Sequence, residues 1–431
     1  MPYIKYVKSA LWKALLATIL FMISYQFYNI EFVRDKIEDF AFDTVNKFAL
    51  FKKDQTVSSP HIFLFAIDDL YMKKHKLFDE DNETNYGYSF PRDQIANFIL
   101  NLDELTSELE EDTYPSALFI DYDFSFTTMP YGKRLSQEDQ KLVDILKQPH
   151  LYTILLPKTS KYNFIEHSSD PDIQAKIRNG SIRFVSVSLL MSNDTVRRYL
   201  GTQTFDSNGS EYISADIALW QKIRHQENNI FKKDDIIANR IIFKAYKPPV
   251  NEESCIMQQS HWETLHRYSA NCSLFDIPYE DFNQSIILLG GTYTHNDDTF
   301  TILNTFGSKT FTGIDIHANT LMTMLYLNGP LKRLSLLWST LIIFISFFLI
   351  DLIITMILDR FHIENEKLSI ILLMLPSAVI LFSISSYLLQ QKHLWFNWSI
   401  PFILFQFTEI IILVRQKSTK AIFKVGKLLN K

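Results

Sequence analysis

Long apolar segments lie near both ends of the chain, and a block of mixed polarity separates them. The segments cover residues 11–28, 336–356, 368–389 and 398–414. Most approach the ~20 apolar residues that a helix needs to cross a bilayer, and the last segment is the shortest. This pattern predicts one N-terminal and three C-terminal transmembrane helices on either side of a central block.

The central block has the pattern of an α/β domain. Short apolar runs predict buried strands at residues 62–67, 117–120, 152–156, 184–190, 241–245 and 286–289. Apolar positions at helical spacing predict helices between them, at residues 92–105, 138–147, 214–224 and 313–327. Strands that alternate with helices favour a mostly parallel sheet with helices on both faces.

Basic residues predict the orientation in the membrane. Lys5, Lys8 and Lys13 open the first segment, and six basic residues with no acidic one follow the last. Because Lys and Arg are enriched on the cytoplasmic side of spans, both termini are expected in the cytoplasm. The expected parts are then a cytoplasmic N-terminus with the first span (1–29), a periplasmic domain (30–333), three spans (334–414) and a basic cytoplasmic tail (415–431).

A cleaved signal peptide is the alternative for the first segment. Residues 25–28 at its exit include three aromatic side chains, where a signal peptidase requires small ones. A retained membrane anchor is therefore expected.

The charge is unevenly distributed along the chain. The whole chain carries −5. The first span region has three lysines, and residues 334–431 have nine basic and five acidic side chains, which leaves about −12 for the block between them. An acidic domain argues against nucleic acid as a partner.

Both cysteines, Cys255 and Cys272, lie in the central block. In an oxidising compartment a bridge between them would add about 2–4 kcal/mol to stability, and two buried free thiols are the alternative. Neither cysteine has the spacing of a metal or redox site. Asn82, Asn208 and Asn283 match an extended acidic glycosylation sequon, which Asn-rich loops also produce by chance.

Acidic residues follow two of the predicted strands, at the edge of a parallel sheet where ligands bind. Asp68 and Asp69 end the first strand, Asp121 and Asp123 end the second, and Arg92 opens a helix. Carboxylates beside an arginine could bind a cation or a phosphate-bearing ligand. The alternative is structural, with the carboxylates capping helices and pairing with Arg92.

A second group combines histidine with aspartate, at His295, Asp297, Asp298, Asp315 and His317. Imidazole and carboxylate suit divalent metals, but no pair has a sharp ligand spacing on a predicted helix. A buried His317 that bonds to a loop is the favoured role. The chain shows no nucleophile elbow, phosphate loop or HExxH helix. We therefore expect no enzymatic activity, cofactor or metal, with a metal-dependent hydrolase at the strand-end carboxylates as a remote alternative.

Three charged residues, Lys13, Asp351 and Glu409, fall within the apolar segments toward their cytoplasmic ends. Charges there are costly, so they pair or reach for the interface. One hypothesis is that Lys13 meets Asp351 or Glu409 and ties the first span to the C-terminal ones. Independent snorkelling is the alternative. The tail at residues 421–429 has one apolar helical face and lysines elsewhere, which suits the inner leaflet or a partner helix.

Several short motifs together resemble the CHASE2 family, extracytoplasmic sensory modules of bacterial signalling receptors. The resemblance covers roughly residues 31–414. In order, the motifs are Phe42-Asp43, Phe65-Ala66-Ile67-Asp68-Asp69, Phe90-Pro91-Arg92, Ile120-Asp121-Tyr122-Asp123, Asp194-Thr195-Val196-Arg197-Arg198, Leu288-Leu289-Gly290-Gly291-Thr292, Asp298-Thr299-Phe300 and Gly313-Ile314-Asp315-Ile316-His317-Ala318-Asn319. Thr195 stands where the family has glycine, and residues 79–85 resemble an insertion.

The resemblance implies a multi-pass protein of the bacterial inner membrane that senses a periplasmic signal. Family members usually carry an output domain after the third C-terminal span, and here a basic tail follows. We therefore expect a separate protein partner to read the signal, and homo-oligomerisation is possible. The alternative is a scaffold or assembly factor of an envelope complex.

Overall fold

Two compact units make up the chain. The computed structural model describes residues 3–27, 30, 33–48, 60–78, 84, 90–110, 113–127, 135–192, 195–205, 209–224, 240–243, 258–259, 264–293, 298–304, 307–361, 366–412 and 414. The terminal unit joins Met1–Phe51 to Leu331–Lys431, and the central unit is Lys52–Pro330.

A seven-stranded sheet forms the middle of the central unit. Its order is β4-β3-β2-β11-β1-β10-β9, and neighbours are parallel except β9 and β10. The strands are β1 (Ile62–Ile67), β2 (Ala117–Asp121), β3 (Thr153–Pro157), β4 (Ile182–Val185), β9 (Gln258–Gln259), β10 (Leu265–Ser269) and β11 (Ile286–Gly291). The mixed α/β fold with a mostly parallel sheet, as the sequence predicts, is confirmed.

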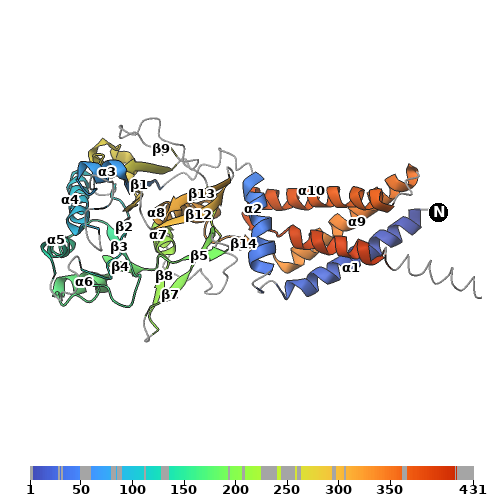
Figure 1. The fold of residues 1–431 in the computed structure, drawn as a ribbon, viewed down its shortest axis with the longest axis horizontal. Helices are drawn as coiled ribbons and strands as arrows, with labels where there is room; N and C mark the ends of the chain where they lie inside the picture. Colours follow the sequence, from blue (N-terminus) through green and yellow to red (C-terminus); the bar gives the residue numbers. More distant parts are fainter. Residues whose placement is uncertain are drawn as a thin grey trace, which may run out of the picture. The chain divides into compact units, whose positions relative to one another are not determined.

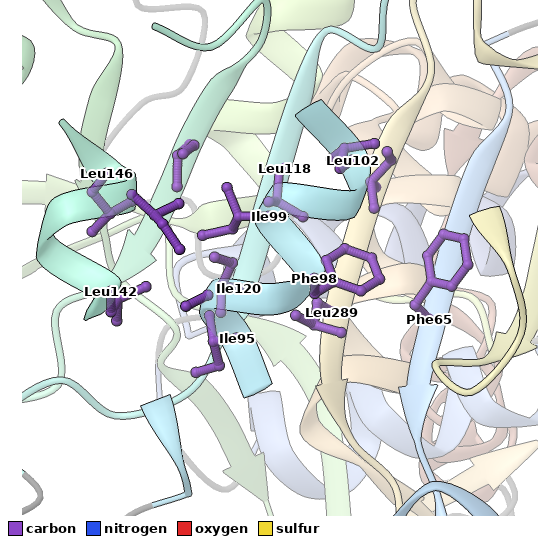
Figure 2. Packing of buried hydrophobic residues seen from close by; sticks show 14 of the residues in the cluster. Phe65, Ile95, Phe98, Ile99, Leu102, Leu118, Ile120, Leu142, Leu146 and Leu289 are labelled. Carbon is purple, nitrogen blue, oxygen red and sulfur yellow. The ribbon is translucent and has the colours of Figure 1, made fainter. Parts of the chain in front are cut away.

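Helices cover both faces of this sheet (Figure 1). α4 (Arg92–Glu108) and α5 (Gln137–Leu146) lie over one face, and α7 (Ala215–Arg224) and α8 (Gly313–Leu327) lie over the other. Each strand contributes side chains to both helix-covered faces, because successive side chains point to opposite sides of the sheet. In β2, Leu118 and Ile120 pack toward α4, as Figure 2 shows, whereas Phe119 contacts His317 of α8.

Helix α8 packs very closely on the sheet. Its side chains are all buried, and it ends at Asn328, which takes the left-handed conformation. Gly290 at the end of β11 permits this approach, because a Cβ there would lie 2.7 Å from the Cβ of Ile314. A side chain at the end of β2 or β11 that faces α8 therefore has little space around it.

A second sheet, with strand order β13-β12-β6-β5, completes the central unit. Its strands are β5 (Leu189–Ser192), β6 (Thr195–Tyr199), β12 (Thr299–Asn304) and β13 (Gly307–Thr312). The smaller elements are α3 (Asp69–Lys74), α6 (Pro171–Asn179), β7 (Thr202–Thr204), β8 (Glu211–Ile213), and the 3-10 helices Leu274–Asp276 and Tyr279–Phe282.

Two strand predictions were wrong. A single strand at residues 184–190 is in fact the end of β4 and the start of β5, which belong to different sheets. The β4 ladder ends at Ser186, whose hydroxyl donates to Gln203 and whose N–H donates to the main-chain oxygen of Ile213. Residues 241–243 are buried but form no strand, and 244–245 lie outside the described residues.

The terminal unit is helical. Its elements are α1 (Tyr3–Tyr25), a π-helix (Val33–Glu38), α2 (Asp39–Phe48), α9 (Leu336–Arg360), α10 (Glu366–Lys392), the helix Ser399–Ile412, and a short parallel pair of β14 (Lys332–Arg333) and β15 (Leu394–Trp395). Within the described residues, three helices are long and apolar enough to cross a membrane: Ile4–Tyr25, Leu336–Arg360 and Leu372–Lys392. The fourth predicted span corresponds to Ser399–Ile412, which is shorter than these.

Small residues bring α1 against α9. The buried side of α1 carries Ala10, Ala14 and Ala17, each with no exposed surface, and α9 buries Ser339 and Ser346. Small side chains let two helix backbones approach closely inside a membrane, where packing and polar contacts hold helices together.

The segment after α1 belongs to the terminal unit, although the sequence analysis assigned it to the central domain. Glu38 is fully buried and accepts hydrogen bonds from Trp395 Nε1 and Asn397 Nδ2. The rings of Phe42 and Trp395 lie 5.1 Å apart, centroid to centroid. These polar and aromatic contacts attach residues 33–48 to the turn that follows α10.

Candidate functional site

Asp68, a candidate ligand residue at the end of β1, serves as a helix cap. Its carboxylate accepts from the Tyr71 main-chain N–H at 2.9 Å and from the Ser269 hydroxyl at 2.9 Å. Asp69 lies in the first turn of the same helix, α3. The cap satisfies an N–H that the start of a helix otherwise leaves unpaired, so Asp68 has a structural role.

Arg92 and Asp123 also hold loops in place. Arg92 is 1% exposed, donates to the main-chain oxygen of Asp123, and lies 4.6 Å above the ring of Phe124. Burial lowers the pKa of Arg92 to about 10, against the opposing effect of Asp139. The Asp123 carboxylate accepts from the Ser125 N–H at 2.8 Å and from the hydroxyl of Thr159. The five strand-end residues therefore do not form one site.

Asp121 has different surroundings from the other strand-end residues. It is the last residue of β2. It follows the same alternation as Phe119, so it faces α8 rather than α4. The Phe119 ring lies 5.4 Å from the ring of His317, edge to face. The sequence analysis placed Asp121 and His317 in two separate candidate groups. The structure brings these two residues to the same face of the sheet.

His317 is the centre of an ionic cluster, which we call the His317 cluster (Asp121, Asp216, Asp298 and His317). Nδ1 of His317 lies 3.1 Å from each carboxylate oxygen of Asp216 on α7, and both side chains are at most 2% exposed. Asp121 and Asp298 act on His317 through their charges. Sequence reasoning missed Asp216, although it lies in the first turn of a predicted helix.

Asp298 brings a third carboxylate to the cluster at the start of α8. The residue is exposed, but one carboxylate oxygen lies only 2.0 Å from where a Cβ of Gly313 would be. A side chain at position 313 would therefore displace the Asp298 carboxylate from this place. The Gly313 N–H also donates to the main-chain oxygen of Asp298 at 3.0 Å.

The neighbouring acid, Asp315, contacts residues outside the His317 cluster. Its carboxylate accepts from the Thr312 hydroxyl at 2.8 Å and lies 3.5 Å from Nε of Arg267. Of the other residues in the second sequence group, His295 and Asp297 lie outside the described residues.

The electrostatics of the His317 cluster favour bound protons. Burial raises the pKa of Asp121 to about 7; His317 opposes this rise, and the negative charges of Asp298 and Asp216 add to it. For His317, burial lowers the pKa, but the carboxylates of Asp216, Asp121 and Asp298 outweigh burial and raise it to about 9. The histidine is thus charged at neutral pH while Asp121 exchanges its proton there.

The arrangement suits proton binding better than metal binding. Across the described parts of the chain, no three His, Cys, Asp or Glu side chains are placed to hold a metal ion. Nδ1 of His317 is already committed to Asp216. Cys272 is bonded in a disulfide, and Cys255 lies outside the described residues, so their pairing stays a prediction.

A second group of charges lies within the terminal unit. Lys13 Nζ is 2.7 Å from Asp351 Oδ1 on α9 and 3.0 Å from Glu409 Oε1 on the helix Ser399–Ile412. The side chains of both acids are at most 8% exposed. Lys13 of α1 thus contacts two later helices. The sequence analysis gave this contact as one hypothesis and independent snorkelling of the charges as the alternative.

Comparison with known families agrees with this architecture. The family model of the CHASE2 domain matches residues 14–353, from within α1 to within α9. The chain therefore belongs to the CHASE2 family, whose members are extracytoplasmic sensory domains. No curated protein and no solved structure matches the chain.

Proposed function

We propose that this protein is a receptor of the bacterial inner membrane. Its central unit detects a periplasmic condition, four spans carry the change inward, and a separate cytoplasmic protein reads it. The family supports sensing, and the lysines at the start of α1 support a cytoplasmic N-terminus. In this proposal the protein is not an enzyme.

The observation that carries the proposal is the link between α1 and the later helices. The central unit is inserted in the chain between α1 with residues 33–48 and β14 with α9. These flanking elements are joined within the terminal unit by Lys13 near the middle of α1 and by Glu38 after the helix. A change in the central unit that moves its two ends therefore acts directly on a connected helix bundle.

Signalling also requires two states that a stimulus occupies unequally. In this proposal α1 shifts relative to α9 while Lys13 keeps one of its two carboxylate partners, and the presence of two partners supports such an element. The tail after the last helix is rich in lysine and suits a cytoplasmic partner.

The test is crosslinking and recovery of the full-length protein from native membranes, with and without residues 416–431. A cytoplasmic signalling protein that is recovered with the full chain and lost with the truncation supports the receptor. Recovery of envelope proteins alone, unchanged by the truncation, overturns it in favour of a scaffold.

A further inference from the structure

We infer that the stimulus of the central unit is a change in proton concentration, read by a proton that binds at Asp121 within the His317 cluster. The inference rests on the proposed receptor function, because it names the signal of that receptor.

The cluster joins separate parts of the central unit. Asp121 ends β2, Asp216 lies in α7, Asp298 precedes β12, and His317 lies in α8. Asp216 and His317 are buried, and Asp121 is mostly buried. Because charges in a poorly solvated interior interact strongly, a proton gained or lost at Asp121 acts on β2, α7 and α8 at once.

The charges of the cluster do not balance. One imidazolium faces three carboxylates, so ionising Asp121 adds a negative charge that competes with Asp216 for His317. A proton on Asp121 removes that competition. The cluster thus has two charge states that differ by one proton and stabilise the start of α8 to different degrees.

Among the residues that the structure describes, few other ionisable groups face the cluster. Among the elements packed against α8, β1 and β11 carry no ionisable residue. The other charges of α7, Lys222 and Arg224, lie at its far end, and Lys309 of β13 has a side chain outside the described set. Asp315 faces Arg267, and Tyr199 of β6 stays neutral, because burial and Asp216 raise its pKa.

The direction of the response follows from proton linkage. The folded-state pKa of Asp121, about 7, lies above its unfolded value near 3.9, so the folded protein binds an extra proton between them. Its contribution to stability is full at acid pH and is lost as the pH rises through 7. His317 acts with the same sign between about 6.5 and about 9.

Another histidine acts with the opposite sign elsewhere. Burial, followed by the charge of His61, lowers the pKa of His266 to about 4, so this residue costs stability as the pH falls below about 6.5. A global unfolding curve would mix the two effects. The test must therefore report on α7 and α8 alone.

The experiment is hydrogen–deuterium exchange of the full-length protein in lipid nanodiscs at pH 6 and pH 8, corrected for the intrinsic pH dependence of exchange. Peptides from α7 and the start of α8 should lose more than about tenfold in protection at pH 8, with about tenfold due to Asp121 and the rest to His317. Asp121→Asn should lose clearly less protection than the wild type, because its side chain cannot ionise and only the share of His317 remains. Asp144→Asn, on the exposed side of α5, should respond as the wild type does.

Equal protection at pH 6 and pH 8 in the wild type would overturn the inference, as would a full response in Asp121→Asn. If that variant does not fold, infrared difference spectra of the wild type decide. They should show the carbonyl band of a protonated carboxylic acid at pH 6 that is lost at pH 8, and its absence refutes the proton site. These readouts need no partner, so they can fail while the receptor proposal stands, and the reverse also holds.

Discussion

Asp121 and Asp123 are two positions apart in the chain, yet they have different roles. Asp121 is the last strand residue and takes the side of β2 that faces α8, whereas Asp123 lies in the following loop and holds Ser125 and Thr159. His317 and Asp216 show the reverse case, because residues 101 positions apart form one ion pair. At the scale of single residues, the direction of each side chain decides whether a carboxylate supports a loop or joins a buried charge cluster.

The ion pair predicts the effect of removing His317. The variant His317→Gln leaves the fully buried Asp216 without its cationic partner, and breaking such a pair costs about 3–5 kcal/mol. We expect a loss of this order in the free energy of unfolding of the central unit, measured by denaturant titration at pH 7.

The double variant Asp216→Asn with His317→Gln should recover part of this loss, because no charge is left unpaired. His167→Gln, whose side chain is half exposed, is the control and should change the free energy of unfolding by less than about 0.5 kcal/mol. Strictly additive effects of the two cluster substitutions would show that the pair does not interact.

Helices of similar composition have different surroundings in this protein. α8 is buried on every side against the sheet and α7, and a glycine at the end of β11 makes room for it. α1 and α9 instead expose apolar residues and bury only one side, where the alanines of α1 and the polar residues Lys13 and Asp351 lie. The contacts along that side define how the helices of the terminal unit are held together.

This packing predicts different effects for two lysines of α1. Lys13→Ala leaves Asp351 and Glu409 together without a cation, so the purified protein in detergent should unfold at a clearly lower temperature. Lys8→Ala removes an exposed lysine five positions earlier and should change stability by less than about 0.5 kcal/mol.

Replacing both acids by their amides in the Lys13→Ala background should restore most of the lost thermal stability. Equal midpoints for Lys13→Ala and Lys8→Ala would show that the three charges do not hold α1 in place.

At the scale of the whole molecule, helix length bears on the number of membrane crossings. Three helices have the length and hydropathy of spans, and Ser399–Ile412 has a length of about 21 Å against a hydrocarbon core of about 30 Å. In the proposed topology this helix also crosses, which brings the C-terminus to the same side as the lysine-rich N-terminus.

Epitope tags test this topology. Tags at both ends should resist an external protease in intact spheroplasts and be cleaved in inverted membrane vesicles. A tag inserted at Gly209, an exposed residue shortly before β8, should show the opposite pattern. Cleavage of the C-terminal tag in spheroplasts would mean that Ser399–Ile412 does not cross.

The sequence by itself determined the features that depend on local pattern. Runs of apolar residues and helical periodicity located β1, β2, β11, α4 and α8 within a few residues, because backbone geometry imposes those spacings. Segment length identified the long apolar helices for the same reason.

Only the tertiary structure decided which polar residues meet. It split residues 184–190 between two sheets, attached residues 33–48 to the terminal unit, and brought Asp216 of α7 to His317. No local signal marks such contacts, because a buried charge is stable only with partners that arrive from distant parts of the chain. The candidate site therefore emerged from the packing of α7, α8 and the ends of two strands.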